Sequence, residues 1–339
     1  MDIDYYLTRS KKLKDDYLWI PYCKDISKIK TAWLIKFQGG EIEVALQSLS
    51  HVAFFGISDG EIPIRFIFEC EKYNVQLAFY TRNASKRFIL SNPGRQGTDI
   101  LTLQINSRSD ERRLNYLGRV ILKNKLQSKK LIFPKYVLPQ LDASMSIPDL
   151  RISEAKSAKV YWKGFYSSLQ VRDCSRKTKH PLNQMLNAGY FFLSTSMIRW
   201  LHHYGFSVFH GFLHSSTRYE ALVWDLIEPY RFIVEKAVIE VWQEQTKTEY
   251  SDDELVRLTI TRITEMLNTQ VVWVHSTQQY VKLKSVLQGA VLALRAYLLG
   301  DQHFVLPLPS AKKGGRPPKV SYILPGQIYK EQLKSMEKK

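Results

Sequence analysis

The sequence predicts an α+β protein, in which a β-rich, sandwich-like N-terminal domain is followed by an all-helical domain. Residues 31–106 contain short runs of β-branched and aromatic residues separated by turn residues, a pattern typical of strands. From Asp110 onward, apolar residues recur instead at the spacing of helices. A basic segment with glycine and proline near its start follows Pro309. These changes predict three parts, at residues 1–108, 109–309 and 310–339.

Five to seven candidate strands make up the first part, with no helical segment between them. Their sequences are TAWLIKF, EIEVALQ, HVAFFGI, IRFIFEC, VQLAFYT, KRFILS and DILTLQI. Turn-forming pairs such as Gly39-Gly40 and Asp59-Gly60 separate the runs. Because parallel strands need a long crossover, usually a helix, uninterrupted strands predict a sandwich or a folded antiparallel sheet and not βαβ units.

Six helices are predicted in the second part. The first covers residues 110–131, where Leu114, Leu117, Ile121 and Leu126 lie at helical spacing. The others are expected at residues 150–172, 182–204, 219–245, 252–267 and 275–300. The third part is expected to be a mobile arm that ends in one short helix. Its KKGGRPPK segment resembles the Gly-Arg-Pro core of minor-groove hooks, but a solvated linker is the favoured interpretation.

The composition favours a protein that binds a polyanion. The formal net charge is +17, from 49 Lys plus Arg against 32 Asp plus Glu, and such cations release condensed counterions when they neutralise phosphates. Three widely separated cysteines exclude a disulfide framework and a cysteine-rich zinc site. Because the chain has no long apolar run and no signal peptide, we expect a soluble cytoplasmic protein without a membrane partner.

Two carboxylates at helical spacing suggest a metal site. Asp225 and Glu228 lie three residues apart among apolar residues, so both project from one face of a predicted helix. Buried like charges repel unless a cation separates them. Together with the imidazole of His214, these oxygens suit Mg²⁺ or Mn²⁺ better than structural zinc. A satisfied core histidine and a solvated acidic face are the simpler alternatives.

Glu154 is a further candidate ligand, near the start of the helix predicted at residues 150–172. Small residues follow it, and then aromatic residues. The residues alone favour a simpler interpretation, in which a glutamate interacts with the helix dipole and the aromatic side chains form a core stripe.

Three ordered motifs resemble those of the CRISPR adaptation integrase family. EAKSAKVYW at 154–162 matches a helix-opening pattern, E-x-x-x-A-x-x-Y followed by an aromatic residue. PLNQMLNAGY at 181–190 matches P-x-N-x-x-L-x-x-G-Y. GFLH at 211–214, Arg218 and LVWDLIEPYR at 222–231 match the third signature, G-F-x-H, then arginine, then L-x-x-D-L-x-E-x-x-R.

The resemblance covers roughly residues 110–310. LGRVILKNKL at 117–126 resembles the family's first helix, and residues 287–308 resemble its last one. Two departures stand out. Pro229 follows Glu228 where the family usually has a helix former, so we expect the helix to kink there. His180 stands where family members often have an acid.

The resemblance implies a metal-dependent DNA endonuclease and integrase that inserts foreign DNA fragments as new spacers into a CRISPR array. A 3′-hydroxyl attacks a phosphodiester in this transesterification. Glu154, His214 and Glu228 are the implied ligands of Mg²⁺ or Mn²⁺, with Asp225 as a supporting acid. The family fold pairs a β-rich dimerising domain with a helical catalytic domain. A homodimer and a small ferredoxin-like adaptation partner protein are therefore expected.

Several cations and aromatic residues near these motifs are candidates for contact with the incoming fragment and the repeat. The segment RDCSRKTKH is too basic for an ordinary turn, although a solvated loop is the alternative. A core role is an equal alternative for the two tyrosines. The DNA-binding candidates are Tyr161, Arg172, Arg176, Lys177, Lys179, Tyr190, Arg218 and Arg231.

Two other functions fit the same residues. A related transposon-type DNA integrase would share the catalytic helices. A non-catalytic basic DNA-binding protein would share the charge, but retention of all the presumed site residues argues against it.

Overall fold

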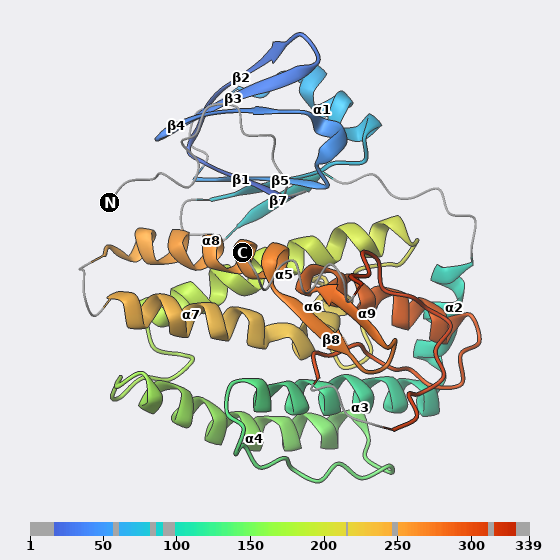
Figure 1. Cartoon of the computed structure of the whole chain (residues 1–339). Coiled ribbons are helices and arrows are strands. Elements are labelled where there is room, and N and C mark those ends of the chain that lie inside the picture. Colours follow the sequence, from blue (N-terminus) through green and yellow to red (C-terminus); the bar gives the residue numbers. More distant parts are fainter. Residues whose placement is uncertain are drawn as a thin grey trace. The chain divides into compact units, whose positions relative to one another are not determined.

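The computed structural model of the chain describes residues 17–56, 61–81, 86–90, 99–214, 216–245, 250–310 and 315–329. The chain divides into two compact units, one formed by residues 1–93 with 251–257 and the other by residues 94–250 with 258–339 (Figure 1). The boundary expected near residue 108 falls inside a helix, α2 (Ile100–Ser109), which belongs to the second unit.

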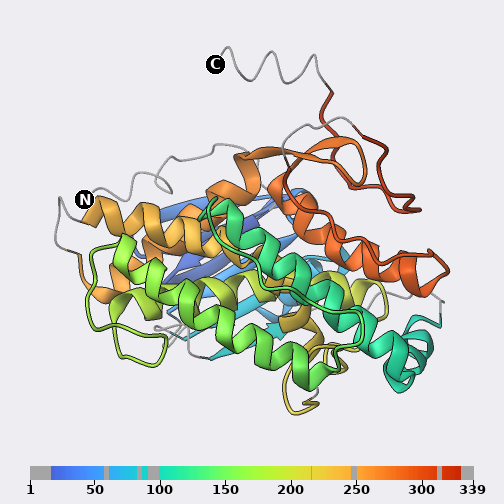
Figure 2. The same cartoon turned by 90° about the horizontal axis from the view of Figure 1, so that it is seen from below.

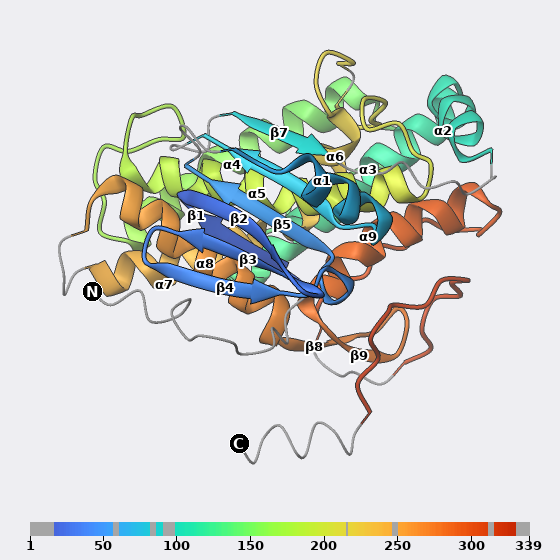
Figure 3. The same cartoon turned by 90° about the horizontal axis from the view of Figure 1, so that it is seen from above.

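The first unit contains two sheets and one described helix (Figure 3). One sheet has the strand order β1-β5-β6-β7, and the other has the order β2-β3-β4. The elements are β1 (Tyr17–Pro21), β2 (Cys23–Ile29), β3 (Ala32–Phe37), β4 (Gly40–Val44), β5 (His51–Phe55), α1 (Ile64–Lys72), β6 (Gln76–Tyr80) and β7 (Arg87–Leu90). The three-stranded sheet is antiparallel, whereas β5 runs parallel to both β1 and β6.

Phe66 of α1 joins the two sheets in one core. Its ring centroid lies 5.0 Å from that of Trp33 on β3 and 6.4 Å from that of Phe54 on β5, both with the rings edge-on. All three side chains are almost completely buried. The expected β-rich, sandwich-like unit is therefore confirmed, with a helix as part of its core.

The prediction that this unit lacks βαβ connections is wrong. IRFIFEC forms α1, which links the parallel strands β5 and β6. Ile64 and Phe68 are 70% and 69% exposed, while Phe66 and Cys70 are buried. The two exposed apolar side chains create an alternation that resembles a strand, although the buried pair has helical spacing. DILTLQI, also predicted as a strand, begins α2, whose buried face includes the polar Gln104 and Ser107 and so hides the helical pattern.

The second unit is mainly helical, as predicted. Its further elements are α3 (Glu111–Ser128), α4 (Ile147–Ser168), α5 (Pro181–His203), α6 (Ala221–Ile227), α7 (Arg231–Gln245), α8 (Asp252–Thr269), β8 (Val271–Val274), β9 (Gln279–Lys282) and α9 (Leu283–Leu298). The start of α8, up to Arg257, belongs to the first unit. The β8–β9 hairpin occupies the start of the segment predicted as a helix at residues 275–300. Figure 2 shows α3 and α4 side by side, and these two helices pack against each other.

Local sequence explains where the helices that carry the site begin. Asp110 accepts hydrogen bonds from the backbone of Arg112 and Arg113, which starts α3. Ser146 and Asp149 form a capping box at the start of α4. His180 caps α5 through its ring Nδ1, which accepts from Leu182 N at 3.2 Å.

The segment after Pro309 is not a free arm over its described part. Tyr322 donates a hydrogen bond to the Val305 carbonyl at 2.6 Å. Leu324 is 1% exposed and exchanges two hydrogen bonds with the Gln279 side chain, of 2.9 and 3.1 Å. Residues 315–329 therefore pack on the helical unit, contrary to the prediction. The short helix expected at the end of the chain lies outside the described residues.

None of the helices that the structure describes is long and apolar enough to cross a membrane.

Candidate active site

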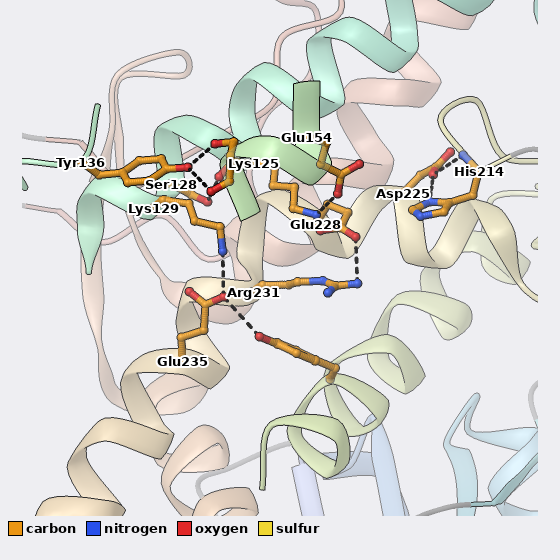
Figure 4. Close-up of polar contacts among 12 residues, drawn as sticks. Lys125, Ser128, Lys129, Tyr136, Glu154, His214, Asp225, Glu228, Arg231 and Glu235 are labelled. Carbon is orange, nitrogen blue, oxygen red and sulfur yellow. Dashed lines mark hydrogen bonds and ion pairs between the residues drawn. The ribbon is translucent and has the colours of Figure 1, made fainter. Parts of the chain in front are cut away.

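Glu154 and Glu228 meet around the ammonium group of Lys125 (Figure 4). Lys125 Nζ forms an ion pair with Glu154 Oε1 and lies 2.6 Å from Glu228 Oε2. Arg231 Nη2 lies 2.8 Å from the other oxygen, Glu228 Oε1. Three helices thus converge, since Lys125 comes from α3, Glu154 from α4 and Arg231 from the start of α7.

The helix break expected at Glu228 is present. α6 ends at Ile227, Glu228–Tyr230 form a single 3₁₀ turn, and α7 begins at Arg231. Pro229 has no N–H to continue the α-helical hydrogen bonding. The side chain of Glu228 is 2% exposed and faces Lys125.

Asp225 holds the loop that carries His214. Its carboxylate is fully buried and accepts hydrogen bonds from the backbone of Phe212, Leu213 and His214. His214 Nδ1 lies 2.6 Å from Asp225 Oδ1. With Nδ1 bound to a carboxylate, Nε2 is the ring nitrogen left for a ligand. Both oxygens of Asp225 are therefore occupied within the protein.

Gly211, the first residue of the GFLH motif, makes this arrangement possible. A Cβ atom at this position would lie 2.7 Å from Asp225 Oδ2 and 2.9 Å from the carbonyl carbon of Ala221. Any other residue would push the loop away from the carboxylate that anchors it.

The charges of the site shift the pKa values of Glu228 and His214. Burial alone would raise the pKa of Glu228, but the neighbouring charges of Arg231 and Lys125 outweigh it and lower the pKa to about 2. Burial likewise opposes protonation of His214, but the hydrogen bond and charge of Asp225 prevail and raise its pKa. The negative charge of Glu228 also contributes to the raised pKa of His214.

The donors present fit a hard divalent cation. Glu228 Oε2 is buried and faces Lys125 Nζ, 2.6 Å away. Carboxylate oxygens with one imidazole suit Mg²⁺ or Mn²⁺. However, no group of three or more His, Cys, Asp or Glu arranged to hold an ion occurs within the described part of the chain. The structure places Glu154 beside Glu228 and His214 beside Asp225. These are two separate pairs, and Glu154, His214 and Glu228 do not form one closed group of three ligands.

A second buried cluster lies beneath the first and centres on Glu235 of α7. Lys129 Nζ lies 3.0 Å from Glu235 Oε1, and Tyr161 and Tyr190 donate hydrogen bonds to Glu235 at 2.6 and 3.2 Å. Both tyrosines are almost completely buried. Of the two roles considered for these tyrosines, their burial fits the core role, and their contact with DNA stays a prediction.

Sequence reasoning missed Lys125, Lys129 and Glu235, although a signal was present. Leu117 and Ile121 are buried at a spacing of four on α3, and Lys125 and Lys129 continue that row. Cations at positions that the helical pattern assigns to the core indicate buried acidic partners.

A basic groove lies along α4, beginning one residue after Glu154. It encloses about 1460 Å³ and is lined by Ala155, Trp162 and Tyr166 as well as by cations. The lining cations are Lys159, Lys163, Arg172, Arg176 and Lys177. Cations beside aromatic rings are the usual means of binding single-stranded nucleic acid.

The remaining predicted DNA contacts have different surroundings. Arg176 donates hydrogen bonds to Asn183 and Asn187 at 2.7 and 2.6 Å and lies over the Trp162 ring, so it also fixes the loop. The guanidinium of Arg231 binds Glu228 and lies 4.7 Å from the Tyr190 ring centroid. Lys179 and Arg218 are exposed. Arg231 thus holds Glu228, and its contact with DNA stays a prediction.

Comparisons with known proteins agree with this architecture. The family model described as CRISPR associated protein Cas1 matches residues 23–269. A curated relative, CRISPR-associated endonuclease Cas1 1 from Francisella tularensis subsp. novicida (strain U112), is 24% identical over 177 residues. That alignment covers 50% of this chain and 55% of the relative.

Two solved structures share the fold. A casposase bound to integration product has a TM-score of 0.68 at 18% identity, covering 84% of this chain and 90% of that one. A Cas6-RT-Cas1–Cas2 complex has a TM-score of 0.62 at 14% identity, covering 86% of this chain and 35% of that one. At these identities the likeness shows the fold alone.

Proposed function

Because the chain belongs to the CRISPR associated protein Cas1 family, whose model matches residues 23–269, we propose that it is a metal-dependent DNA endonuclease and integrase. It inserts foreign DNA fragments as new spacers into a CRISPR array. A 3′-hydroxyl of the fragment attacks a phosphodiester of the repeat, and the broken strand leaves with its own 3′-hydroxyl.

The observation that carries the proposal is the pairing of Glu154 with Glu228 around a cation, beside a histidine held by a carboxylate. An ion held by Glu154, His214 and Glu228 would polarise the scissile phosphate and favour loss of the attacking hydroxyl's proton. Asp225 positions His214 through Nδ1. Arg231 holds Glu228 by one oxygen and leaves the other directed into the site.

The groove beside Glu154 suits the single-stranded end of the fragment. Lys159, Lys163, Arg172 and Lys177 would neutralise phosphates, and the Trp162 ring offers a surface for base stacking. Because Ala155 and Lys159 line the groove, a strand held there would lie along α4, the helix that also carries Glu154. Positioning of the reacting groups in line is the second contribution that this chain would make.

We also propose the partners that the sequence suggested. These are DNA, a second copy of the chain joined through the N-terminal part, and a small adaptation protein. The fold shared with a complex that contains Cas1 and Cas2 supports a Cas2 protein as that partner. We further propose that residues 1–108 form the dimerisation domain, that residues 109–309 form the catalytic domain and that residues 310–339 form a basic C-terminal tail. We also propose a cytoplasmic location.

A strand-transfer assay tests the reaction. A fragment with free 3′-hydroxyls is incubated with a supercoiled plasmid that carries a CRISPR repeat, with Mn²⁺, with Mg²⁺ or with EDTA. We expect joining only with metal, and none for Glu154→Ala, His214→Ala or Glu228→Ala, although these variants still bind DNA. Full joining by His214→Ala would contradict the ligand assignment.

The same assay separates the alternatives. The casposase shares the fold, so the fold alone does not exclude a transposon-type integrase. Such an enzyme would join fragments equally well to a plasmid without the repeat. A non-catalytic DNA-binding protein would retard both plasmids and join to neither.

A further inference from the structure

Lys125 is the charged group at the centre of the site that the proposed reaction does not use. Lysine is rarely buried unless it is paired, and Lys125 is only 8% exposed. Its ammonium contacts one oxygen of Glu154 and one of Glu228. No other described residue makes an ion pair with both carboxylates.

The pocket is formally neutral with Lys125 in place. Glu154 and Glu228 carry two negative charges, and Lys125 and Arg231 carry two positive ones. A divalent ion that entered beside Lys125 would meet a like charge within a few ångströms, in a place with little water to screen it. If Lys125 leaves, the ion replaces a monovalent cation between the same two oxygens.

Of the two cations, Lys125 is the one that can leave. The Arg231 guanidinium lies between aromatic rings, 4.7 Å from the Tyr190 centroid and 5.9 Å from the Trp224 centroid. A lysine ammonium is a compact charge on a flexible stem, and no ring contact is found for Lys125 among the described residues. Glu228 Oε2 is the oxygen that Lys125 faces, 2.6 Å from its ammonium nitrogen.

We propose that Lys125 is a resident cation that holds Glu154 and Glu228 together in the metal-free protein, and that a divalent ion displaces it from between them. This inference rests on the proposed function, because the ion is the one the integrase would use. It explains why the carboxylates remain paired in a pocket where their repulsion would otherwise separate them.

The first test measures the affinity of the full chain for Mn²⁺ by electron paramagnetic resonance of the free ion. Lys125→Met removes the charge and keeps most of the side-chain volume. Because the ion then displaces no competing cation, we expect the dissociation constant for Mn²⁺ to fall at least tenfold, which is about 1.4 kcal/mol. A structural role alone would leave the affinity unchanged or weaken it.

Lys129→Met is the matched control. Lys129 is another buried lysine, one turn further along, but its carboxylate partner is Glu235. Its removal should destabilise the protein to a similar degree, with a dissociation constant for Mn²⁺ within a factor of about two of the wild-type value. The comparison separates a general loss of stability from removal of the competing charge.

The second test uses the wild-type protein and does not depend on the folding of a variant. Lysines are acylated with an amine-reactive ester with and without Mn²⁺, and the modified positions are quantified by mass spectrometry. Displacement frees the Lys125 amine, so its labelling should rise with Mn²⁺, whereas labelling of Lys129 should not change.

The outcomes distinguish this inference from the function on which it rests. If the wild type binds Mn²⁺ but Lys125→Met binds it no more tightly, or if labelling of Lys125 is insensitive to Mn²⁺, the resident-cation role is wrong and the proposed function stands. If neither protein binds Mn²⁺, both proposals fail.

Discussion

Replacement of Asp225 by asparagine should destabilise the helical unit and release His214. Each carboxylate oxygen of Asp225 faces two donors. Oδ2 accepts from the backbone of Phe212 and Leu213, and Oδ1 accepts from the backbone and ring of His214. An asparagine has one oxygen and one NH₂ group. On the Oδ2 side its NH₂ group would face the backbone N–H groups of Phe212 and Leu213, and on the Oδ1 side it would face the backbone N–H of His214.

The magnitude follows from these contacts. At least one hydrogen bond to an ionised group is lost, and two when the NH₂ group faces Phe212 and Leu213, at about 1.5–3 kcal/mol each, which gives about 1.5–6 kcal/mol. The site is fully buried, so water cannot replace the lost acceptor. A unit of this size changes its melting temperature by about 2–4 °C per kcal/mol. The transition of the helical unit should therefore fall by about 3 °C or more.

Differential scanning calorimetry of the wild type and Asp225→Asn measures this shift. Asp149→Asn is the control, because Asp149 also accepts hydrogen bonds near a helix start but is exposed. The variant should join DNA more slowly but still bind Mn²⁺, since Asp225 is not a proposed ligand. A shift no larger than that of the control would refute the anchoring role, and complete loss of Mn²⁺ binding would make Asp225 the ligand.

Three further predictions follow from the structure. The double variant Arg172→Gln/Lys177→Gln should bind single-stranded DNA with a smaller salt dependence than the wild type. In a filter-binding titration, the slope of log affinity against log salt should fall in magnitude by about 1.4. An unchanged slope would show that neither residue contacts the DNA. The pKa of Glu228 is lowered from 4.5 to about 2. The wild type should therefore be more stable than Glu228→Gln by a constant amount above about pH 4.5, and this difference should decline as the pH falls towards 2. Equal melting temperatures of the two proteins at pH 6 would contradict the cause given for the shift. Leu324→Ala should cost about 2–5 kcal/mol in chemical denaturation, because Leu324 is 1% exposed; a negligible effect would mean that this segment contributes nothing to the folded unit.

Periodicity predicted the helical unit because its long helices have a buried face. The order of the GFLH and LVWDLIEPYR motifs also placed His214, Asp225 and Glu228 in one neighbourhood, since the loop returns directly into α6. The contacts within that neighbourhood could not be predicted. Sequence spacing put Asp225 and Glu228 on one face, but only the fold shows that Asp225 turns towards the loop backbone and Glu228 towards α3.

The failed predictions have a common physical cause, which is that single side chains departed from the average pattern. Ile64 and Phe68 are apolar but exposed, so the sequence of this helix has the alternating pattern of a strand. Gln104 and Ser107, buried in α2, removed the apolar stripe that would have revealed it. The segment after Pro309 looked like a linker because its few apolar residues are isolated, but Tyr322 and Leu324 are both buried. A burial pattern set by distant contacts cannot be read from local composition.

The buried cations show why the site needs more than its carboxylates. Glu154, Glu228 and Glu235 are each paired with a lysine or an arginine of the same unit. For Glu228, burial alone would raise the pKa, and the neighbouring charges of Arg231 and Lys125 lower it. Lys125 and Arg231 therefore keep Glu228 ionised before any metal arrives. Because Arg231 and Lys129 are fixed by aromatic rings and Lys125 is not, only the position between Glu154 and Glu228 is left open to exchange.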